Sequence, residues 1–176
     1  PAPLEELNVR LPTAPLCAIA LSAVVVSTAH AEVRPAELDS AAAALESRVI
    51  EWRRDFHAHP ELGNREFRTA AKVAEHLRKL GLEVRTGMAH TGVVAILRGA
   101  LPGPTILLRA DIDALPVTER TEVPFRSTAT GEFRGRKVGV MHACGHDAHT
   151  AMLMGTAQVL AGLRERLPGT ILFMFQ

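Results

Sequence analysis

The chain has 176 residues, enough for one globular domain, and its composition of 47% apolar and 22% charged residues fits a protein with a substantial core. The formal net charge at pH 7 is +1, from 20 lysines and arginines against 19 aspartates and glutamates. This balance argues against a nucleic-acid partner or a polybasic membrane contact, because both depend on a clear excess of basic residues.

The first 31 residues have the features of a secretory signal segment. Residues 16–26 form an uncharged apolar run that is too short to cross a bilayer as a helix, and Ala29 and Ala31 provide the small residues that a signal peptidase reads. We therefore expect a signal segment at 1–31, a mature domain at 32–176, and a periplasmic or secreted location. A disordered extension is the alternative, because the region before the apolar run is not clearly positive.

Three helices are predicted from the spacing of apolar residues. Residues 35–57 carry apolar side chains at i, i+4, i+7 and i+11, which favours one buried stripe on a helix. A second helix is expected from about residue 64 to 80, with Asn64 as its N-cap and Gly81 just beyond its end. A third helix is expected over residues 147–166, which carry apolar residues at helical spacing, and a Pro-Gly pair then ends it.

Strands are expected between and after these helices, at residues 82–85, 92–98, 105–110 and 170–175. The run at 105–110 is continuously apolar, which predicts a buried strand, and the residues after it up to about 138 read as a polar loop. Alternating helices and strands predict an α/β sandwich around a largely buried, mixed sheet. Ligands of such sheets bind beyond the carboxyl ends of the strands.

Residues 141–149 concentrate side chains that bind metal ions. They include Cys144 and His146, with histidines on either side at positions 142 and 149. Thiolate and imidazole are preferred ligands of zinc and related ions, and in an extended loop residues two apart point to the same side. Metal binding by this cluster, with Cys144 and His146 as candidate ligands, is therefore favoured. Taken singly, His142 and His149 could be ordinary packed histidines, and Cys144 could be a small buried hydrophobic residue. With the signal segment removed, Cys144 is the one remaining cysteine, and no intrachain disulfide is expected.

Two aspartates follow the strand at 105–110, so they are expected at the same sheet edge as the metal-binding loop. Asp111 could accept the second ring N–H of a ligand histidine and so orient it, or it could form a turn. For Asp113 the turn role is favoured. His57 and His59, at the end of the first helix, could bind metal, but histidines at helix ends more often interact with the helix dipole.

Three sequence blocks stand out together: residues 53–63 (RRDFHAHPELG), 108–116 (LRADIDALP) and 141–149 (MHACGHDAH). They resemble the M20 metallopeptidase and amidohydrolase family, and within it the branch of aminoacylases, hippurate hydrolases and indoleacetyl-amino-acid hydrolases. The last residues, 169–176, are similar to the strand that leads into a Pro-Ala-Glu-Glu motif in that family. The resemblance extends over residues 47–176.

The resemblance implies a zinc-peptidase-like α/β sandwich and a two-metal amidohydrolase that cleaves the amide bond of N-acyl amino acids. Cys144 and His146 match metal ligands of the family, and Asp111 matches the aspartate that orients the site. Arg109 stands where the wider family has a ligand histidine, so it is not expected to bind metal. The position of His57 is expected to have a structural role.

The resemblance also implies that the fold is incomplete, with the general base, the remaining ligands, the end of the catalytic domain and a dimerisation domain beyond Gln176. Residues 1–176 alone are then expected to be inactive and to bind metal weakly. The expected partners are two divalent ions (zinc or manganese, with cobalt or nickel as further candidates), a small N-acyl amino acid substrate and a second subunit. Nucleic acid, and a membrane after signal removal, are not expected. A dipeptidase or carboxypeptidase of the same clan, and a non-catalytic exported metal-binding protein, are the alternatives.

Overall fold

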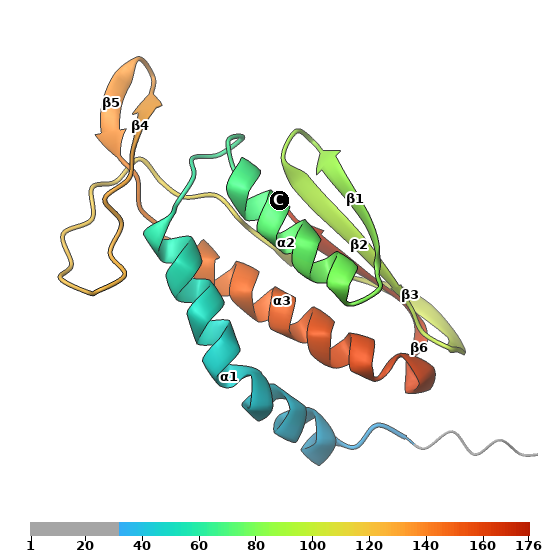
Figure 1. The fold of residues 1–176 in the computed structure, drawn as a ribbon. Coiled ribbons are helices and arrows are strands. Elements are labelled where there is room, and N and C mark those ends of the chain that lie inside the picture. Colours follow the sequence, from blue (N-terminus) through green and yellow to red (C-terminus); the bar gives the residue numbers. More distant parts are fainter. Residues whose placement is uncertain (1–31) are drawn as a thin grey trace, which may run out of the picture.

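Three helices and a four-stranded sheet form most of the fold (Figure 1). The structure is a computed structural model that describes residues 32–176, so the predicted signal segment at 1–31 lies outside the described residues. The elements are α1 (Pro35–Ala58), α2 (Phe67–Lys79), β1 (Glu83–Met88), β2 (Gly92–Arg98), β3 (Leu101–Ala110), β4 (Thr130–Phe133), β5 (Arg136–Gly139), α3 (His146–Gly162), a short 3-10 helix η1 (Arg164–Arg166) and β6 (Pro168–Phe175).

The main sheet is mixed, with the strand order β1-β2-β6-β3. Strand β2 pairs with β1 and β6 in the antiparallel sense, whereas β3 runs parallel to β6. Helix α3 lies between β3 and β6 in the chain, as a parallel pair requires a crossover connection. The predicted mixed α/β architecture is confirmed. Because β3 and β6 are parallel, their carboxyl ends meet at one edge of the sheet.

The core lies between the sheet and the helices, which gather on one side of it (Figure 1). Along β6, Ile171, Phe173 and Phe175 are buried, and the residues between them are partly exposed. This alternation is the period-2 pattern of a strand with one face on the core. The expectation of a buried strand at 105–110 is wrong: Ile106 is 47% and Leu107 is 50% exposed. The reason is that β3 lies at the edge of the sheet in the described residues, with a neighbouring strand on one side only. The apolar run by itself does not show where in the sheet a strand lies.

Helix α2 begins three residues later than predicted. Asn64 is not its N-cap, since Asn64 has a left-handed backbone with φ 61° and lies before the helix. The first N–H groups of α2 are instead bound by a carboxylate from the preceding turn: Glu61 accepts from the main chain of Arg68 at 3.0 Å and of Thr69 at 2.8 Å. The predicted end is confirmed, because Gly81 has φ 71° just after the helix.

The segment expected to be a plain polar loop contains a hairpin, formed by β4 and β5. Its turn places Arg134 and Gly135 at positive φ, 52° and 72°, as a tight two-residue hairpin turn requires. These two strands have four residues each and are mostly polar, so they gave no hydrophobic signal. The third helix ends at Gly162, and η1 occupies the remainder of the predicted range.

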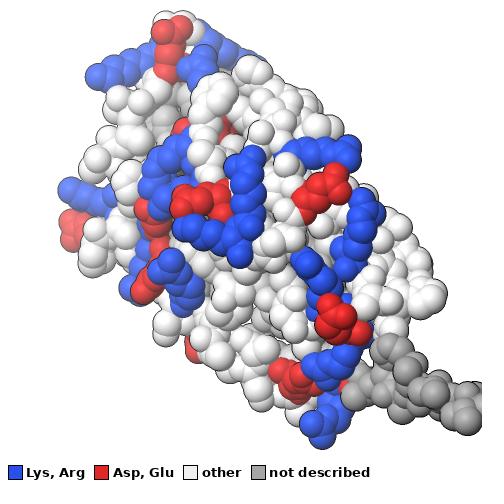
Figure 2. All heavy atoms as spheres, turned by 45° about the vertical axis from the view of Figure 1, so that its right-hand side comes forward, with Lys and Arg blue, Asp and Glu red and all other residues white. Residues whose placement is uncertain are grey.

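Acidic and basic side chains are interspersed on the surface seen in Figure 2, as the near-zero net charge suggests. Within residues 32–176, none of the helices combines the length and the apolar character that crossing a membrane would need.

Candidate metal centre

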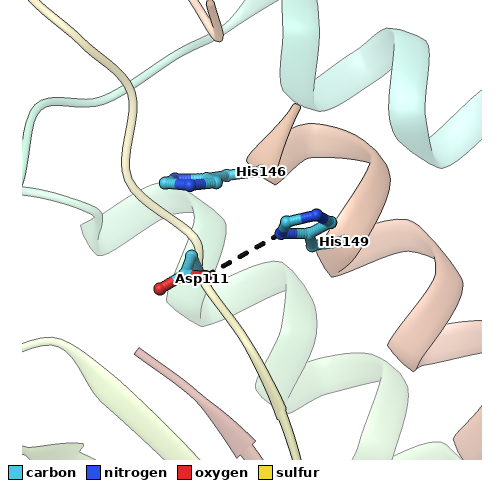
Figure 3. Close-up of side chains that lie close together, drawn as sticks. All are labelled: Asp111, His146 and His149. Carbon is cyan, nitrogen blue, oxygen red and sulfur yellow. Dashed lines mark ion pairs between the residues drawn. The ribbon is translucent and has the colours of Figure 1, made fainter. Parts of the chain in front are cut away.

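The carboxyl end of β3 and the first turn of α3 bring three potential metal ligands together (Figure 3). Asp111 follows β3 directly, and His146 and His149 lie one turn apart at the start of α3, on the same side of the helix. The hydroxyl of Thr150 ties the two segments together, since it is within hydrogen-bond distance of the main-chain oxygens of Asp111 (3.1 Å) and His146 (2.8 Å). The prediction that two polar loops meet at one sheet edge is confirmed.

The donor atoms of this cluster suit a divalent metal ion. One carboxylate oxygen of Asp111 and one ring nitrogen each of His146 and His149 lie within 4.8 Å of one another. Two ligand atoms that share one ion, each about 2.0–2.3 Å from it, are at most about 4.6 Å apart, so small side-chain movements would let these atoms bind the same ion. Carboxylate and imidazole together bind zinc, manganese, cobalt and nickel. The side chain of His149 is about half exposed, so the cluster is open to small molecules.

Asp113 fixes the orientation of His146. The Nδ1 of His146 lies 2.9 Å from a carboxylate oxygen of Asp113 and 3.0 Å from the Asp113 main-chain oxygen. A ring N–H that donates to these acceptors leaves Nε2 as the nitrogen available to a metal. The orienting role was expected of Asp111, and Asp113 was expected to be a turn residue. The structure instead gives that hydrogen bond to Asp113 and places Asp111 among the potential ligands.

Asp111 lies between a guanidinium and an imidazole. Its two carboxylate oxygens are 2.8 Å from Nη1 of Arg109 and 3.8 Å from Nδ1 of His149. Arg109 therefore acts on the site by holding Asp111. The sequence did not single out His149, although its spacing of three residues from His146 on a helix was the available signal.

Cys144 is exposed and does not belong to this cluster in the described part of the chain. The expectation that Cys144 and His146 point to the same side assumed an extended loop. That assumption is wrong, because Gly145 between them is left-handed with φ 85° and helix α3 begins at His146. The role of Cys144 as a metal ligand stays a prediction that rests on the family resemblance.

His142 is buried behind the turn, with 4% of its surface exposed. Burial lowers the pKa of His142 to about 4, and the nearby carboxylate of Asp147 opposes this effect without overcoming it. His142 is therefore neutral at pH 7 and does not add a positive charge to the site.

This low pKa predicts that the metal-free protein loses stability in mild acid. Between pH 6.5 and 4 the unfolded chain protonates His142 and the folded chain does not, so the free energy of unfolding falls as the pH falls. Between pH 7.5 and 5 the expected loss is about 2 kcal/mol. Urea unfolding of the wild type and of His142→Gln in the presence of a chelator measures it. The free energy of unfolding of the wild type should fall by about 2 kcal/mol more than that of the variant. An equal fall in both proteins would contradict the low pKa of His142.

Known proteins resemble this chain over most of its described length. The model of peptidase family M20/M25/M40 matches residues 107–176. An N-acyl-L-amino acid amidohydrolase of Geobacillus stearothermophilus is 47% identical over 128 residues, which cover 73% of this chain and 32% of the relative. Thermostable carboxypeptidase 1 of Saccharolobus solfataricus is 47% identical over 133 residues, which cover 75% of this chain and 32% of the relative.

A crystal structure from Bacillus subtilis, described as a dinuclear metal-binding peptidase of family M20, matches with a TM-score of 0.67 and 44% identity. The match covers 76% of this chain and 35% of the other. The chain thus spans about a third of the length of the curated relatives that it matches.

Proposed function

The chain belongs to peptidase family M20/M25/M40, and from this membership we propose that the protein is a metal-dependent amidohydrolase of N-acyl amino acids. One observation carries the proposal: Asp111, His146 and His149 converge at the carboxyl edge of the parallel strands. The relatives that share this segment include an amidohydrolase named for N-acyl-L-amino acids and two deacetylases named for N-acetylcysteine.

Two divalent ions are the proposed cofactors, zinc or manganese, with cobalt and nickel as further candidates. Asp111, His146 and His149 would hold metal, and Cys144 is added by the resemblance. When bound, such ions polarise an amide carbonyl and make water a stronger nucleophile at neutral pH. The chain's own contribution is to fix the ligands: Asp113 sets the tautomer of His146, and Arg109 orients the carboxylate of Asp111.

Location and assembly are further parts of the proposal. The apolar run at 16–26 and the small residues Ala29 and Ala31 support export to the periplasm or the medium, with residues 1–31 as the signal. The family resemblance supports a homodimer, and a general base and further ligands outside residues 1–176. On this account residues 1–176 by themselves bind metal weakly and do not hydrolyse N-acyl amino acids.

A carboxypeptidase acting on peptides is the second candidate. The observation that favours it is the 47% identity to thermostable carboxypeptidase 1 of Saccharolobus solfataricus, the same identity as to the amidohydrolase. An exported protein that binds metal without catalysis is the third candidate, and it would use the same cluster.

A substrate panel separates these candidates. The product of the complete open reading frame is assayed with N-acetyl and N-benzoyl amino acids and with dipeptides, and Cys144→Ala is compared with His59→Ala, an exposed histidine outside the cluster. We expect hydrolysis of N-acyl amino acids that Cys144→Ala removes and His59→Ala retains. Faster cleavage of peptides would support the carboxypeptidase, and metal binding with no turnover would support the non-catalytic protein.

A further inference from the structure

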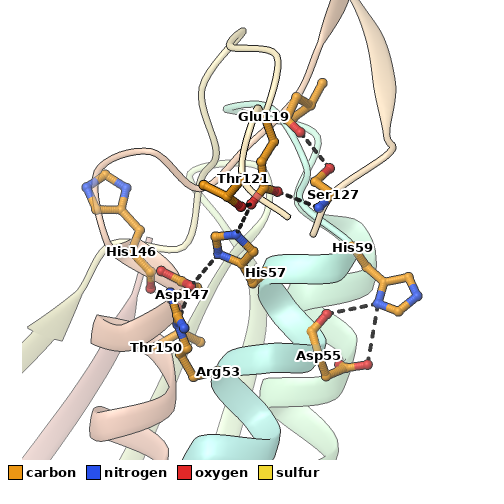
Figure 4. A network of polar contacts seen from close by, with 11 residues as sticks. Arg53, Asp55, His57, His59, Glu119, Thr121, Ser127, His146, Asp147 and Thr150 are labelled. Carbon is orange, nitrogen blue, oxygen red and sulfur yellow. Dashed lines mark hydrogen bonds and ion pairs between the residues drawn. The ribbon is translucent and has the colours of Figure 1, made fainter. Parts of the chain in front are cut away.

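A largely buried network of polar side chains lies behind the metal-binding turn (Figure 4). Oδ2 of Asp147, at the start of α3, is 2.8 Å from Nε of Arg53 and 2.8 Å from Nδ1 of His57, both on α1. The other ring nitrogen of His57, Nε2, is 3.0 Å from Glu119 in the loop after β3. The side chains of His57, Asp147 and Glu119 are 5%, 1% and 0% exposed.

His57 bridges two carboxyl groups that belong to different segments. Each of its ring nitrogens lies within hydrogen-bond distance of a carboxylate oxygen, Nδ1 of one on Asp147 and Nε2 of one on Glu119. Burial raises the pKa of Glu119, but hydrogen bonds from Thr121, His57 and Ser127 together hold it below the usual value, so this carboxyl is ionised. His57 is therefore a buried bridge between Asp147 on α3 and Glu119 in the loop after β3.

The aromatic ring of Phe125 packs against the buried group formed by His57, Asp147 and Glu119. The ring of Phe125 meets the ring of His57 edge-on at 5.6 Å, and the guanidinium groups of Arg53 and Arg54 lie 5.3 and 5.2 Å from the centre of the Phe125 ring. Charges in such surroundings interact strongly, and each depends on its partners for stabilisation.

Asp147 connects this network to the metal-binding turn through the main chain. Asp147 is adjacent in sequence to His146, and both belong to the first turn of α3 with His149. Arg53 and His57 on α1 hold the Asp147 carboxylate. These contacts therefore fix the orientation of the first turn of α3 relative to α1. At the far end of the network, Glu119 accepts hydrogen bonds from the main-chain N–H of Ser127 and the hydroxyl of Thr121. The loop after β3 is therefore part of the same hydrogen-bond network.

We propose that His57 is a positioning residue of the metal centre: as a buried bridge between Asp147 and Glu119, it fixes the turn that carries His146 and His149. The inference rests on one part of the proposed function, that the turn binds a metal. It does not depend on which substrate the protein hydrolyses. His57 touches neither metal nor substrate, and it acts through the Asp147 carboxylate.

The test is the metal affinity of the complete protein, measured by competition of zinc and of manganese with a chromogenic chelator. Substitution of groups that hold metal ligands in place commonly weakens affinity about 10- to 100-fold, and we expect a loss in this range for His57→Gln. If the protein hydrolyses N-acyl amino acids, kcat should fall while KM changes little, because no contact to substrate is removed.

A milder variant keeps the test readable if His57→Gln does not fold. Glu119→Gln retains the shape of the side chain and removes one of the two charges facing His57. Metal affinity should fall by about tenfold or less. Wild-type metal affinity in folded Glu119→Gln and in folded His57→Gln would overturn the proposal.

Asp55→Asn is the matched control. Asp55 lies on the same helix as His57 and pairs with Arg68 at 2.8 Å and Lys72 at 2.6 Å, but these contacts lead to α2 and away from the turn. This variant should lower the melting temperature without changing metal affinity. If His57→Gln, or Glu119→Gln in its place, behaves like Asp55→Asn, the role of His57 is only structural and the proposal is wrong. Tight metal binding without amide hydrolysis would refute the proposed function but not this inference, because the metal affinities of wild type and variants could still be compared.

Discussion

Replacing His146 with alanine is expected to lower kcat/KM for N-acyl amino acids at least about a thousandfold, or about 4 kcal/mol of transition-state stabilisation. His146 combines two properties that no other described histidine has together: a ring nitrogen in the ligand cluster and a second nitrogen held by a carboxylate, that of Asp113. Without this imidazole the described cluster keeps one histidine and one carboxylate, so the complete protein would hold its metal with one ligand fewer.

Steady-state kinetics and metal content of the same preparations measure this effect in the complete protein. His59→Ala is the control, because His59 is exposed at the end of α1 and its Nδ1 is occupied by the Asp55 main-chain oxygen. The control should keep wild-type activity and metal content. Activity of His146→Ala within tenfold of the wild type would show that the cluster is not the catalytic metal site.

Replacing Asp147 with alanine is expected to destabilise the fold by about 3–5 kcal/mol, because it removes a buried carboxylate that contacts two side chains of α1. His57 loses one of its two carboxylates, and the guanidinium of Arg53 loses its 2.8 Å ion pair. Urea unfolding followed by circular dichroism, with chelator present, measures the free energy of unfolding independently of bound metal.

Glu51→Ala is the comparison for that measurement. Glu51 pairs with Arg48 at 2.7 Å on α1, but both side chains are exposed, so the loss should be below about 1 kcal/mol. If Asp147→Ala costs no more than Glu51→Ala, the buried ion pairs contribute little net stability.

The sequence predicted the parts of the fold that depend on local pattern. Apolar spacing located all three long helices, and the apolar runs located the four strands of the main sheet, because both signals come from neighbours in the chain. The same reasoning placed Asp111 and the 141–149 loop at one edge, since the carboxyl ends of parallel strands meet there. It did not predict that β3 lies at the edge, which depends on strand order and not on the apolar run itself.

The finer arrangement of the site depends on contacts between distant segments. Glu119 is 62 residues from His57 along the chain, and Asp147 is 90 residues from it, so no local pattern could connect the three. That Asp113, and not Asp111, contacts the ring of His146 has a similar cause. The two aspartates are two residues apart just after β3, and only the position of α3 decides which of them meets His146.

Removal and restoration of metal is the measurement that tests the central claim most directly. The complete protein is dialysed against a chelator, assayed with N-acetyl amino acids, and assayed again after addition of zinc or manganese. The account predicts that hydrolysis disappears with the bound metal, returns in proportion to metal added to the wild type, and does not return in His146→Ala. Hydrolysis that persists in metal-free protein, or returns fully in His146→Ala, would contradict a metal centre at this edge of the sheet.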